Sequence, residues 1–415
     1  MDPHDRTATS SALSRGMMSM LLRRYPPPAE FGNNELSALK DLVQAMTQAL
    51  GQGEMSIDLG SSNQKPSELE ADGWPETHRR VIEASGWLQQ EPVLMVMEGD
   101  HLLWRRWHQG MEMLKKTLIQ RSSLYPVGGP SRRCSEDGTK RLTSEQTFNP
   151  EQRAAVNAVS DHRVVLLSGG PGTGKTSTVR AMLIRAMEDR GDLRIHLAAP
   201  TGKAARRLQD SIRGDQRTAE LPCTTLHRLL QARPGGFSRH RRNQLALDLL
   251  VIDEASMVDL TLAQALIDAL PATAQLLLVG DANQLSPIGV GAVWQHLQKE
   301  DLQRRFGTAA VRLHQVYRNR GDLARLSSVL CRQGTETFWS ELADLDDKTN
   351  VHQLVSESSR LPVSVTDAVN QQLKNLRLAA NSLEIRPDGS PDPGQAGALL
   401  ERLDALIVLC PRRRG

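Results

Sequence analysis

The residues with the clearest chemical pattern form a glycine-rich segment around Lys175 and Thr176. The segment reads Gly169-Gly170-Pro171-Gly172-Thr173-Gly174-Lys175-Thr176-Ser177 and follows the apolar run 164–168. Glycines let the backbone curl so that successive N–H groups point at phosphate oxygens, and the positive end of a helix starting near Gly174 adds to this attraction. We expect Lys175 to reach the β- and γ-phosphates of ATP and the Thr176 hydroxyl to bind Mg²⁺. The whole segment 169–177 is the predicted nucleotide-binding loop.

Two carboxylates, Asp253 and Glu254, end a second apolar run at 249–252. Paired carboxylates at such a place often only cap the next helix. Downstream of a phosphate loop, however, we expect Asp253 to hold Mg²⁺ through water and Glu254 to polarise the attacking water as a general base.

A third candidate for the nucleotide site is Gln152, which precedes the loop in the sequence. A glutamine amide can pair with both the donor and the acceptor edge of adenine. The same segment also has the pattern of a helix start, with Asn149 as the cap and Pro150 in the first turn. The two interpretations are compatible.

The elements that must position these residues are short apolar runs that alternate with helical segments. The runs are 164–168, 195–200, 249–253 and 275–280. This alternation predicts an α/β fold, in which a parallel sheet is covered by helices on both faces. Ligands of such sheets bind at the carboxyl ends of the strands. Residues 1–126 have a different texture, with a predicted helix over 34–50 and a strand–turn–strand signal within 89–103.

Composition excludes several classes of protein. The chain has 415 residues, 51 basic and 48 acidic, so its formal charge of +3 does not indicate a nucleic-acid binder and any basic surface must be local. The four cysteines lie far apart without a CxxC pair, which argues against a zinc site or a disulfide framework and predicts reduced thiols in the cytoplasm. No apolar run approaches the length of a membrane-spanning helix.

Further segments, together with the loop and the carboxylates, resemble the core motifs of superfamily-one DNA helicases, which are P-loop NTPases of the AAA ATPase type. They are Thr201-Gly202-Lys203-Ala204-Ala205-Arg206, Thr224-Thr225-Leu226-His227, 280–288 and 313–318. The resemblance implies that the first two segments bind DNA, through Thr201, Gly202, Lys203, Arg206, Thr224, Thr225 and His227. It implies that Gln284 senses the γ-phosphate and that Arg318 acts as an arginine finger from a second domain. Since it neighbours Leu226 and Leu229, His227 could instead be a structural residue.

Within this superfamily, the amino-acid sequences of 253–258, 280–290 and 94–107 resemble those of the RecD family, the α subunits of RecBCD-type enzymes (exonuclease V). The resemblance implies ATP- and Mg²⁺-dependent 5′–3′ translocation on single-stranded DNA, unwinding of duplex ends, and a role in double-strand break repair by recombination. RecB- and RecC-type subunits are the implied partners, and residues 1–126 the implied docking domain. Lys175, Glu254, Gln284 and Arg318 are the implied catalytic residues. A stand-alone RecD-like helicase is the alternative within the same family.

The sequence departs from the family pattern after Arg318. Helicases of this class have two RecA-like domains with ATP between them, and the later motifs of the second domain are missing here. We therefore predict a linker at 127–144, a RecA-like domain at 145–312 and a partial second RecA-like domain at 313–415, in which 406–410 forms a strand. The chain would then be a truncated one. A subunit that binds nucleotide or a partner without hydrolysis is the remaining alternative.

Overall fold

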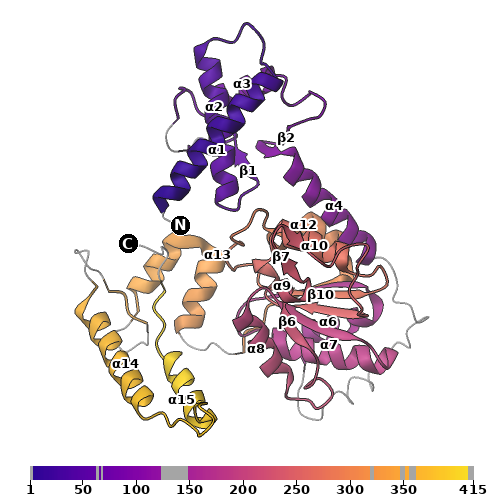
Figure 1. The fold of residues 1–415 in the computed structure, drawn as a ribbon, viewed down its shortest axis with the longest axis vertical. Helices are drawn as coiled ribbons and strands as arrows, with labels where there is room; N and C mark the ends of the chain where they lie inside the picture. Colours follow the sequence, from indigo (N-terminus) through magenta and orange to yellow (C-terminus); the bar gives the residue numbers. More distant parts are fainter. Residues whose placement is uncertain are drawn as a thin grey trace. The chain divides into compact units, whose positions relative to one another are not determined.

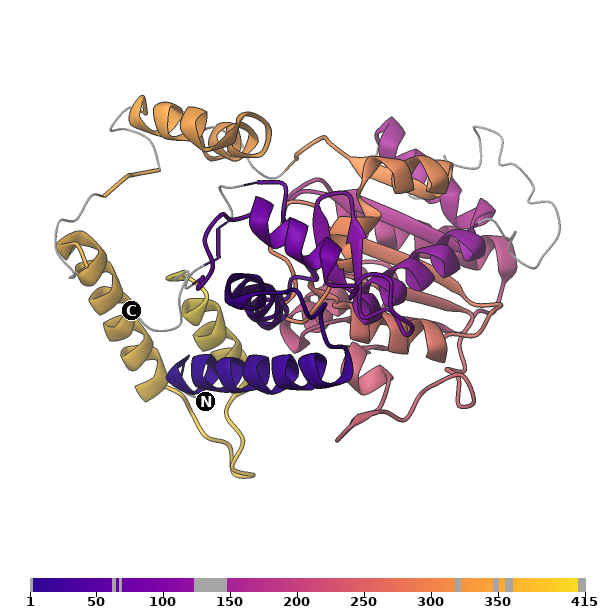
Figure 2. The ribbon, with the colours of Figure 1, turned by 90° about the horizontal axis from the view of Figure 1, so that it is seen from above.

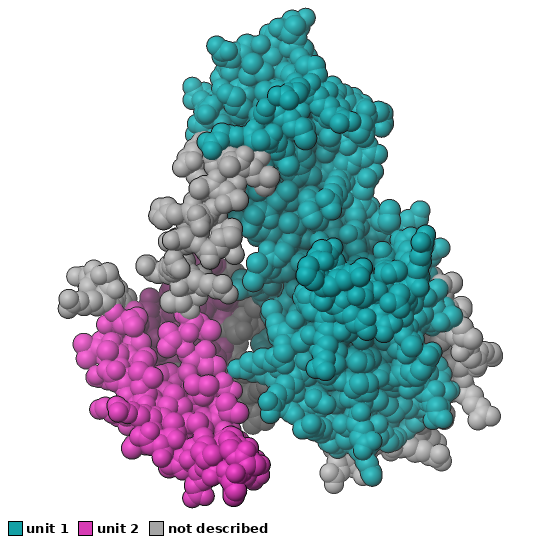
Figure 3. Space-filling view, viewed as in Figure 1, with its two compact units in different colours: residues 1–319 teal, residues 320–415 magenta. Residues whose placement is uncertain are grey.

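The computed structural model describes residues 3–61, 65–66, 69–122, 148–317, 322–345, 351–354 and 361–409. The chain divides into two compact units, Met1–Asn319 and Arg320–Gly415, coloured separately in Figure 3. The predicted linker at 127–144 lies outside the described residues. The domain boundaries at 126 and 312 remain predictions.

A six-stranded parallel sheet forms the centre of the first unit. Its strands are β4 (Val164–Gly169), β5 (Ile195–Ala199), β6 (Cys223–Thr225), β9 (Leu249–Ile252), β10 (Gln275–Gly280) and β11 (Ala310–Leu313). They are ordered β11-β4-β10-β9-β5-β6, and every neighbouring pair is parallel. The four apolar runs predicted as strands are therefore confirmed, and with them the α/β fold.

Helices cover both faces of this sheet (Figure 1 and Figure 2). On one face lie α6 (Pro150–Asp161), α7 (Lys175–Arg190) and α8 (Gly202–Ile212), packed on Val165 and Leu167 of β4. On the other lie α4 (Arg105–Ser122), α10 (Leu260–Ala269), α11 (Val293–Leu297) and α12 (Glu300–Phe306), packed on Val164 and Leu166. Successive strand residues point to opposite faces, so each continuous apolar run supplies both cores.

Short elements connect the strands at the edge that carries the predicted motifs. They are α9 (Leu226–Leu229), the two-residue strands β7 (Ala232–Arg233) and β8 (Gly236–Phe237), and the 3₁₀ turn η2 (Ala255–Met257), whereas the 3₁₀ turn η3 (Gly307–Ala309) precedes β11 at the opposite edge. The strands β7 and β8 pair as an antiparallel hairpin between α9 and β9.

The first hundred residues build a separate small core. Its elements are α1 (Pro3–Arg24), α2 (Asn33–Gly51), α3 (Glu76–Ala84) and the antiparallel strands β1 (Ser56–Asp58), β2 (Met95–Glu98) and β3 (His101–Trp104), in the order β1-β3-β2. The predicted helix at 34–50 and the predicted strand–turn–strand are both confirmed. Trp87 and Ile82 are fully buried at the centre of this core.

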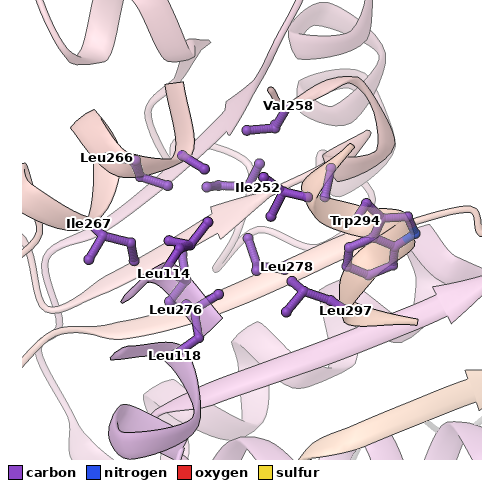
Figure 4. Close-up of a pocket in the computed structure, with 13 residues that line it drawn as sticks. Leu114, Leu118, Ile252, Val258, Leu266, Ile267, Leu276, Leu278, Trp294 and Leu297 are labelled. Atoms are coloured by element: carbon purple, nitrogen blue, oxygen red, sulfur yellow. The ribbon is translucent and has the colours of Figure 1, made fainter. Parts of the chain in front are cut away.

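Helix α4 joins the small core to the sheet. It begins directly after β3, and its apolar side chains Met111, Leu114 and Leu118 belong to the core of the sheet rather than to the N-terminal core. Leu114 and Leu118 line an apolar cavity of about 20 Å³ together with Ile252, Leu278 and other side chains (Figure 4). A cavity of this size has room for about one water and no polar partner for it. The parallel sheet and the N-terminal region therefore share structure through α4.

The second unit is helical over its described residues. It contains α13 (Asp322–Ala343), α14 (Val363–Asn381) and α15 (Pro393–Leu403), and neither α14 nor α15 has a buried residue. The predicted strand at 406–410 is wrong over its described part, since 406–409 is exposed and has no strand structure. A strand needs a neighbour to satisfy its backbone N–H and C=O groups, and the described residues of this unit offer no sheet for it to join. Among the helices that the structure describes, none is long and apolar enough to cross a membrane.

Candidate nucleotide and nucleic-acid site

The carboxyl ends of all six strands lie at one edge of the sheet, because all six are parallel. The predicted phosphate loop follows β4, Asp253 follows β9, and the Gln284 segment follows β10. Thr201 and Thr225, the predicted DNA contacts, lie at the ends of β5 and β6. The fold thus gathers motifs from five separate parts of the sequence along one edge.

The backbone of the phosphate loop needs its glycines. Gly172 and Gly174 have φ angles of +76° and +83°, a region in which side chains cost energy. Gly174 precedes the first residue of α7, so the N–H groups of the first turn remain available to an anion. The Thr173 hydroxyl donates to the carbonyl of Gly170 at 2.9 Å and fixes the curl of the loop.

The Lys175 ammonium group is held at this loop. Its Nζ donates to the carbonyl oxygens of Gly169 at 2.7 Å and Gly170 at 2.9 Å. Both Lys175 and the neighbouring Thr176 are half-buried, and Ser177 donates its hydroxyl back to Gly174 at 2.8 Å. The positive charge therefore lies beside the N–H groups that begin α7, where a phosphate group would meet both.

Asp253 lies at the carboxyl end of the strand next but one to the phosphate loop. Its backbone N–H donates to Ala198 at 3.0 Å, and its side chain accepts from the N–H of Glu254 at 2.9 Å. Burial raises the pKa of Asp253, while the hydrogen bond from Glu254 and the nearby Lys175 ammonium lower it, and the net shift is upward. A buried carboxylate beside a lysine is a favourable ligand for a divalent cation, since the cation removes the cost of burying the charge.

Glu254 has a left-handed backbone, with φ 53° and ψ 43°. This conformation is costly for a residue that carries a side chain, and such strain is concentrated at functional sites. Ser256, two residues later, donates its hydroxyl to Oε1 of Gln284 at 3.2 Å. The turn after β9 and the segment after β10 are therefore joined by a direct hydrogen bond.

Trp294 supports the segment that carries Gln284. It is fully buried, and a Cβ atom at Gly280 would lie 2.7 Å from its ring, so the ring packs directly under the end of β10. Trp294 is therefore a core residue beneath this segment. The side chain of Asp281 accepts from the N–H of Asn283 at 3.0 Å and shapes the turn that follows.

Gln152 takes part in a helix cap. Its backbone N–H donates to Oδ1 of Asn149 at 2.8 Å, and its side-chain Oε1 accepts from the N–H of Asn149 at 3.1 Å. Its Nε2 lies 2.7 Å from the place a Cβ of Gly174 would occupy, so its amide is next to the phosphate loop. The predicted capping role is confirmed, and the contact with adenine stays a prediction.

Tyr317 is a site residue to which we assigned no role from the sequence. Its N–H donates to the carbonyl of Gly172 at 2.7 Å, and its hydroxyl accepts from Nδ2 of Asn149 at 3.0 Å. A ring carbon lies 4.0 Å from the Cβ position of Gly174. The sequence did hold a signal for Tyr317. Only 3% of the residues are aromatic, and this one lies in a segment that resembles a nucleotide-contacting motif. Arg318, the next residue and the predicted arginine finger, lies outside the described residues.

Glu151 holds the start of this last segment. Its carboxylate accepts from the N–H of His314 and pairs with Nδ1 of the same residue, both at 2.8 Å. Burial alone raises the pKa of Glu151, but the hydrogen bonds from His314 lower it further than that. The start of α6 and the end of β11 are thereby tied together, with Tyr317 beside both.

The predicted DNA contacts fall into exposed and engaged side chains. Lys203, Arg206 and His227 are exposed, and Gly202 begins α8 beside them. Thr201 and Thr225 cap the helices α8 and α9 through their hydroxyls, at 3.2 and 3.3 Å. Lys203 and Arg206 of α8 and His227 of α9 thus follow two neighbouring strands of the sheet as exposed side chains.

Thr224 differs from the other predicted contacts. Its hydroxyl is hydrogen bonded to Nε2 of His196 at 2.9 Å, and burial lowers the pKa of His196, so this histidine is neutral at pH 7. The structure therefore places the side chain of Thr224 in the sheet, next to β5. The ring of His227 lies 6.1 Å from that of Phe237 in the hairpin.

The chain from 221 to 247 contains no acidic residue and five arginines. Arg228, Arg233 and Arg242 are exposed, whereas Arg241 pairs with Asp268 at 2.8 Å. This hairpin region, 227–242, supplies the local positive charge that the net charge of the whole chain conceals. Over the described residues, no group of three or more His, Cys, Asp or Glu side chains is arranged to hold a metal by itself.

Comparison with known proteins shows what this site is similar to. Residues 152–290 match the model of the AAA domain. The RecBCD enzyme subunit RecD of Mycobacterium tuberculosis is 37% identical over 272 residues, which cover 60% of this chain and 45% of that protein. The corresponding subunit of Mycolicibacterium smegmatis is 33% identical over 335 residues, or 74% of this chain and 58% of that protein.

The ATP-dependent RecD2 DNA helicase of Deinococcus radiodurans is 41% identical over 184 residues, which cover 44% of this chain and 24% of that protein. The chain spans about half the length of the curated RecD proteins that it matches. It is a homologue of the RecD proteins, and the resemblance to superfamily-one helicases is confirmed.

Proposed function

We propose that this homologue of RecD is an ATP-dependent DNA helicase subunit that moves 5′ to 3′ along single-stranded DNA in double-strand break repair. The observation that carries the proposal is the hydrogen bond between Ser256 and Gln284 at 3.2 Å. It connects the carboxylates that would act on ATP to the segment that would sense its γ-phosphate. A site that only stores nucleotide has no need of such a connection.

The residues of the phosphate edge fit MgATP. In this mechanism Lys175 exchanges the carbonyl oxygens of Gly169 and Gly170 for phosphate oxygens, and the first turn of α7 donates its N–H groups. Thr176 and Asp253 would hold Mg²⁺, which when bound neutralises charge on the phosphates. Glu254 takes a proton from the water whose oxygen attacks the γ-phosphorus, as the bond from phosphorus to the ADP oxygen breaks.

The adenine end of the site is assigned to Gln152 and Tyr317. Both lie against Gly174, and Tyr317 is held there by its hydrogen bonds to Gly172 and Asn149. The tyrosine ring can stack on a base, and the amide of Gln152 can pair with its edge. Arg318 follows Tyr317 directly and is the proposed arginine finger.

The DNA strand is proposed to follow the ends of β5 and β6. Lys203, Arg206 and His227 are exposed there, Thr201, Gly202 and Thr225 supply the helix starts, and Thr224 lies beside them in β6. Helix N-termini and cations bind phosphate oxygens without regard to sequence, as translocation requires. The arginines of the hairpin region extend this surface.

Two alternatives remain for comparison. A subunit that binds nucleotide without hydrolysis is disfavoured because Lys175, Asp253 and Glu254 are all present at the carboxyl edge of the sheet. A stand-alone helicase is disfavoured because the similarity to RecD of M. smegmatis covers 74% of the chain, against 44% for RecD2. RecB- and RecC-type subunits are therefore the proposed partners, with residues 1–126 as the proposed docking region. A role in chromosomal repair would place the protein in the cytoplasm.

Strand displacement on tailed duplexes tests this function. We expect ATP- and Mg²⁺-dependent unwinding of a duplex with a 5′ single-stranded tail, and little unwinding of the same duplex with a 3′ tail. The variants Lys175→Ala and Glu254→Gln should abolish unwinding, and Glu254→Gln should still bind nucleotide. Unwinding from the 3′ tail, or activity that survives Lys175→Ala, would show that the proposed function is wrong.

A further inference from the structure

We propose that the turn between α2 and β1, residues 52–55, positions the segment that carries Gln284 and thereby sets the response of the site to ATP. The inference rests on the proposed function for its kinetic consequence, but its structural part does not. It makes Gly53, which lies in the N-terminal region and far from the phosphate loop in the sequence, a positioning residue of the ATP site.

Gly53 contacts the backbone of the segment after Gln284. Its carbonyl oxygen accepts from the N–H of Gly291 at 3.0 Å. A Cβ atom at Gly53 would lie 3.0 Å from the carbonyl oxygens of Pro287 and Gly289, and 3.2 Å from that of Ile288. The φ angle of Gly53 is +89°, so both its conformation and its neighbours favour glycine. The contact is therefore one of backbone against backbone, with no flexible side chain between.

Met55, at the end of the same turn, also contacts the segment after Gln284. It is buried in the core of the sheet, although it belongs to the N-terminal region by sequence. Its sulfur lies 3.1 Å from the place a Cβ of Gly291 would occupy. The turn is thus anchored in the sheet core on one side and touches 287–291 on the other.

The opposite side of the same segment is held by the start of α10. The N–H of Leu260 donates to the carbonyl of Val290 at 3.1 Å, and Gly289 packs directly on the carboxylate of Asp259. By contrast, the side chains of Leu285 and Ile288 are 90% and 88% exposed. Within 285–291, Pro287 is buried and Val290 packs against the core of the sheet, and the backbone contacts with Gly53 and with α10 hold the rest of the segment.

A short path connects the segment 287–291 to the groups proposed to act on ATP. Pro287 is three residues from Gln284, and Gln284 is hydrogen bonded to Ser256, which follows Glu254 in the same turn. A shift of a few tenths of an ångström at 287–291 therefore reaches the proposed sensor and the proposed base. A partner subunit that moves the N-terminal region would act on ATP turnover by this route.

A pair of alanine variants separates this role from simple backbone strain. Gly53→Ala places a methyl group against three carbonyl oxygens at a positive φ. Gly99→Ala, in the turn between β2 and β3, also has a positive φ, +61°, but has nothing within 4 Å of the new methyl group. Both variants carry the strain of a side chain at a positive φ, and only the first touches the segment after Gln284.

Two measurements are made on the full chain. Amide hydrogen exchange of 284–291 should be faster in Gly53→Ala than in the wild type and unchanged in Gly99→Ala. In single-stranded-DNA-stimulated ATP hydrolysis, kcat of Gly53→Ala should fall about fivefold with an unchanged KM for ATP, since a full ångström of misplacement costs about a hundredfold. Gly99→Ala should keep both constants.

The outcomes decide the inference separately from the function. Equal exchange at 284–291 in the two variants, or equal kcat, would overturn the positioning role. If the wild type hydrolyses no ATP, the proposed function fails, and the exchange of 284–291 still decides whether Gly53 positions this segment. Should Gly53→Ala not fold, Met55→Ala repeats the exchange measurement, with faster exchange at 284–291 expected and unchanged exchange refuting the role.

Discussion

The left-handed backbone of Glu254 gives a prediction about stability and activity together. At φ 53° and ψ 43° a residue with a side chain is strained by about 1–2 kcal/mol, and glycine is not. Glycine also has a more flexible unfolded state, which offsets about 0.5–1 kcal/mol of this gain. We therefore expect Glu254→Gly to be more stable than Glu254→Gln by about 1 kcal/mol, a factor of about five in the folding equilibrium.

Glu254→Gln is the matched control because it retains the shape and the backbone strain of the side chain and removes only its basicity. Urea unfolding at pH 7, followed by far-UV circular dichroism, gives the two free energies of unfolding. ATP hydrolysis should be lost in both variants, since neither can accept the proton of water. If Glu254→Gly is the less stable of the two, the backbone at this position is not strained and the reasoning is refuted.

Three further predictions concern burial and charge. Burial raises the pKa of Asp253 above its ordinary 3.8, so the folded state loses stability as pH rises from 3.8 through the higher pKa of the folded state. Nucleotide-free Asp253→Asn should therefore exceed the wild type in urea stability at pH 7, but not below pH 3.8. Burial, aided by Lys299 and Lys115 and opposed by Glu112 and Asp301, lowers the pKa of His296 to about 4. The unfolded chain binds that proton first, so stability should fall by about 3 kcal/mol between pH 6.5 and 4, and His296→Gln should abolish this part of the loss. Leu114→Ala enlarges the cavity beside α4 and should lower the free energy of unfolding by about 2–5 kcal/mol; a loss below about 1 kcal/mol would show that α4 is not part of the sheet core.

The sheet and the phosphate edge were predictable because their signals are local. Each of the apolar runs 164–168, 195–200, 249–253 and 275–280 is a short buried strand, and each is followed by the polar or glycine residues that its motif requires. Parallel pairing then brings the strand ends to one edge without further information. The local motif signals identified the loop residues, and the parallel pairing of the strands placed them at the same edge of the sheet as Asp253.

Contacts between distant segments could not be predicted in the same way. Nothing in the sequence near Met111 or Gly53 indicates that α4 enters the sheet core or that the 52–55 turn touches 287–291. Tyr317 meets Gly174 only because the chain after β11 turns back over the loop. The run 406–410 has the composition of a strand, but composition cannot supply the neighbouring strand that pairing requires.

The most direct test of the account is the rate of ATP hydrolysis by the full chain with and without single-stranded DNA, measured beside Lys175→Ala. The account predicts Mg²⁺-dependent hydrolysis that DNA stimulates and that Lys175→Ala abolishes, because Lys175 is held at the phosphate loop of a helicase-type sheet. A wild-type rate that does not rise above that of Lys175→Ala when DNA is added would contradict it.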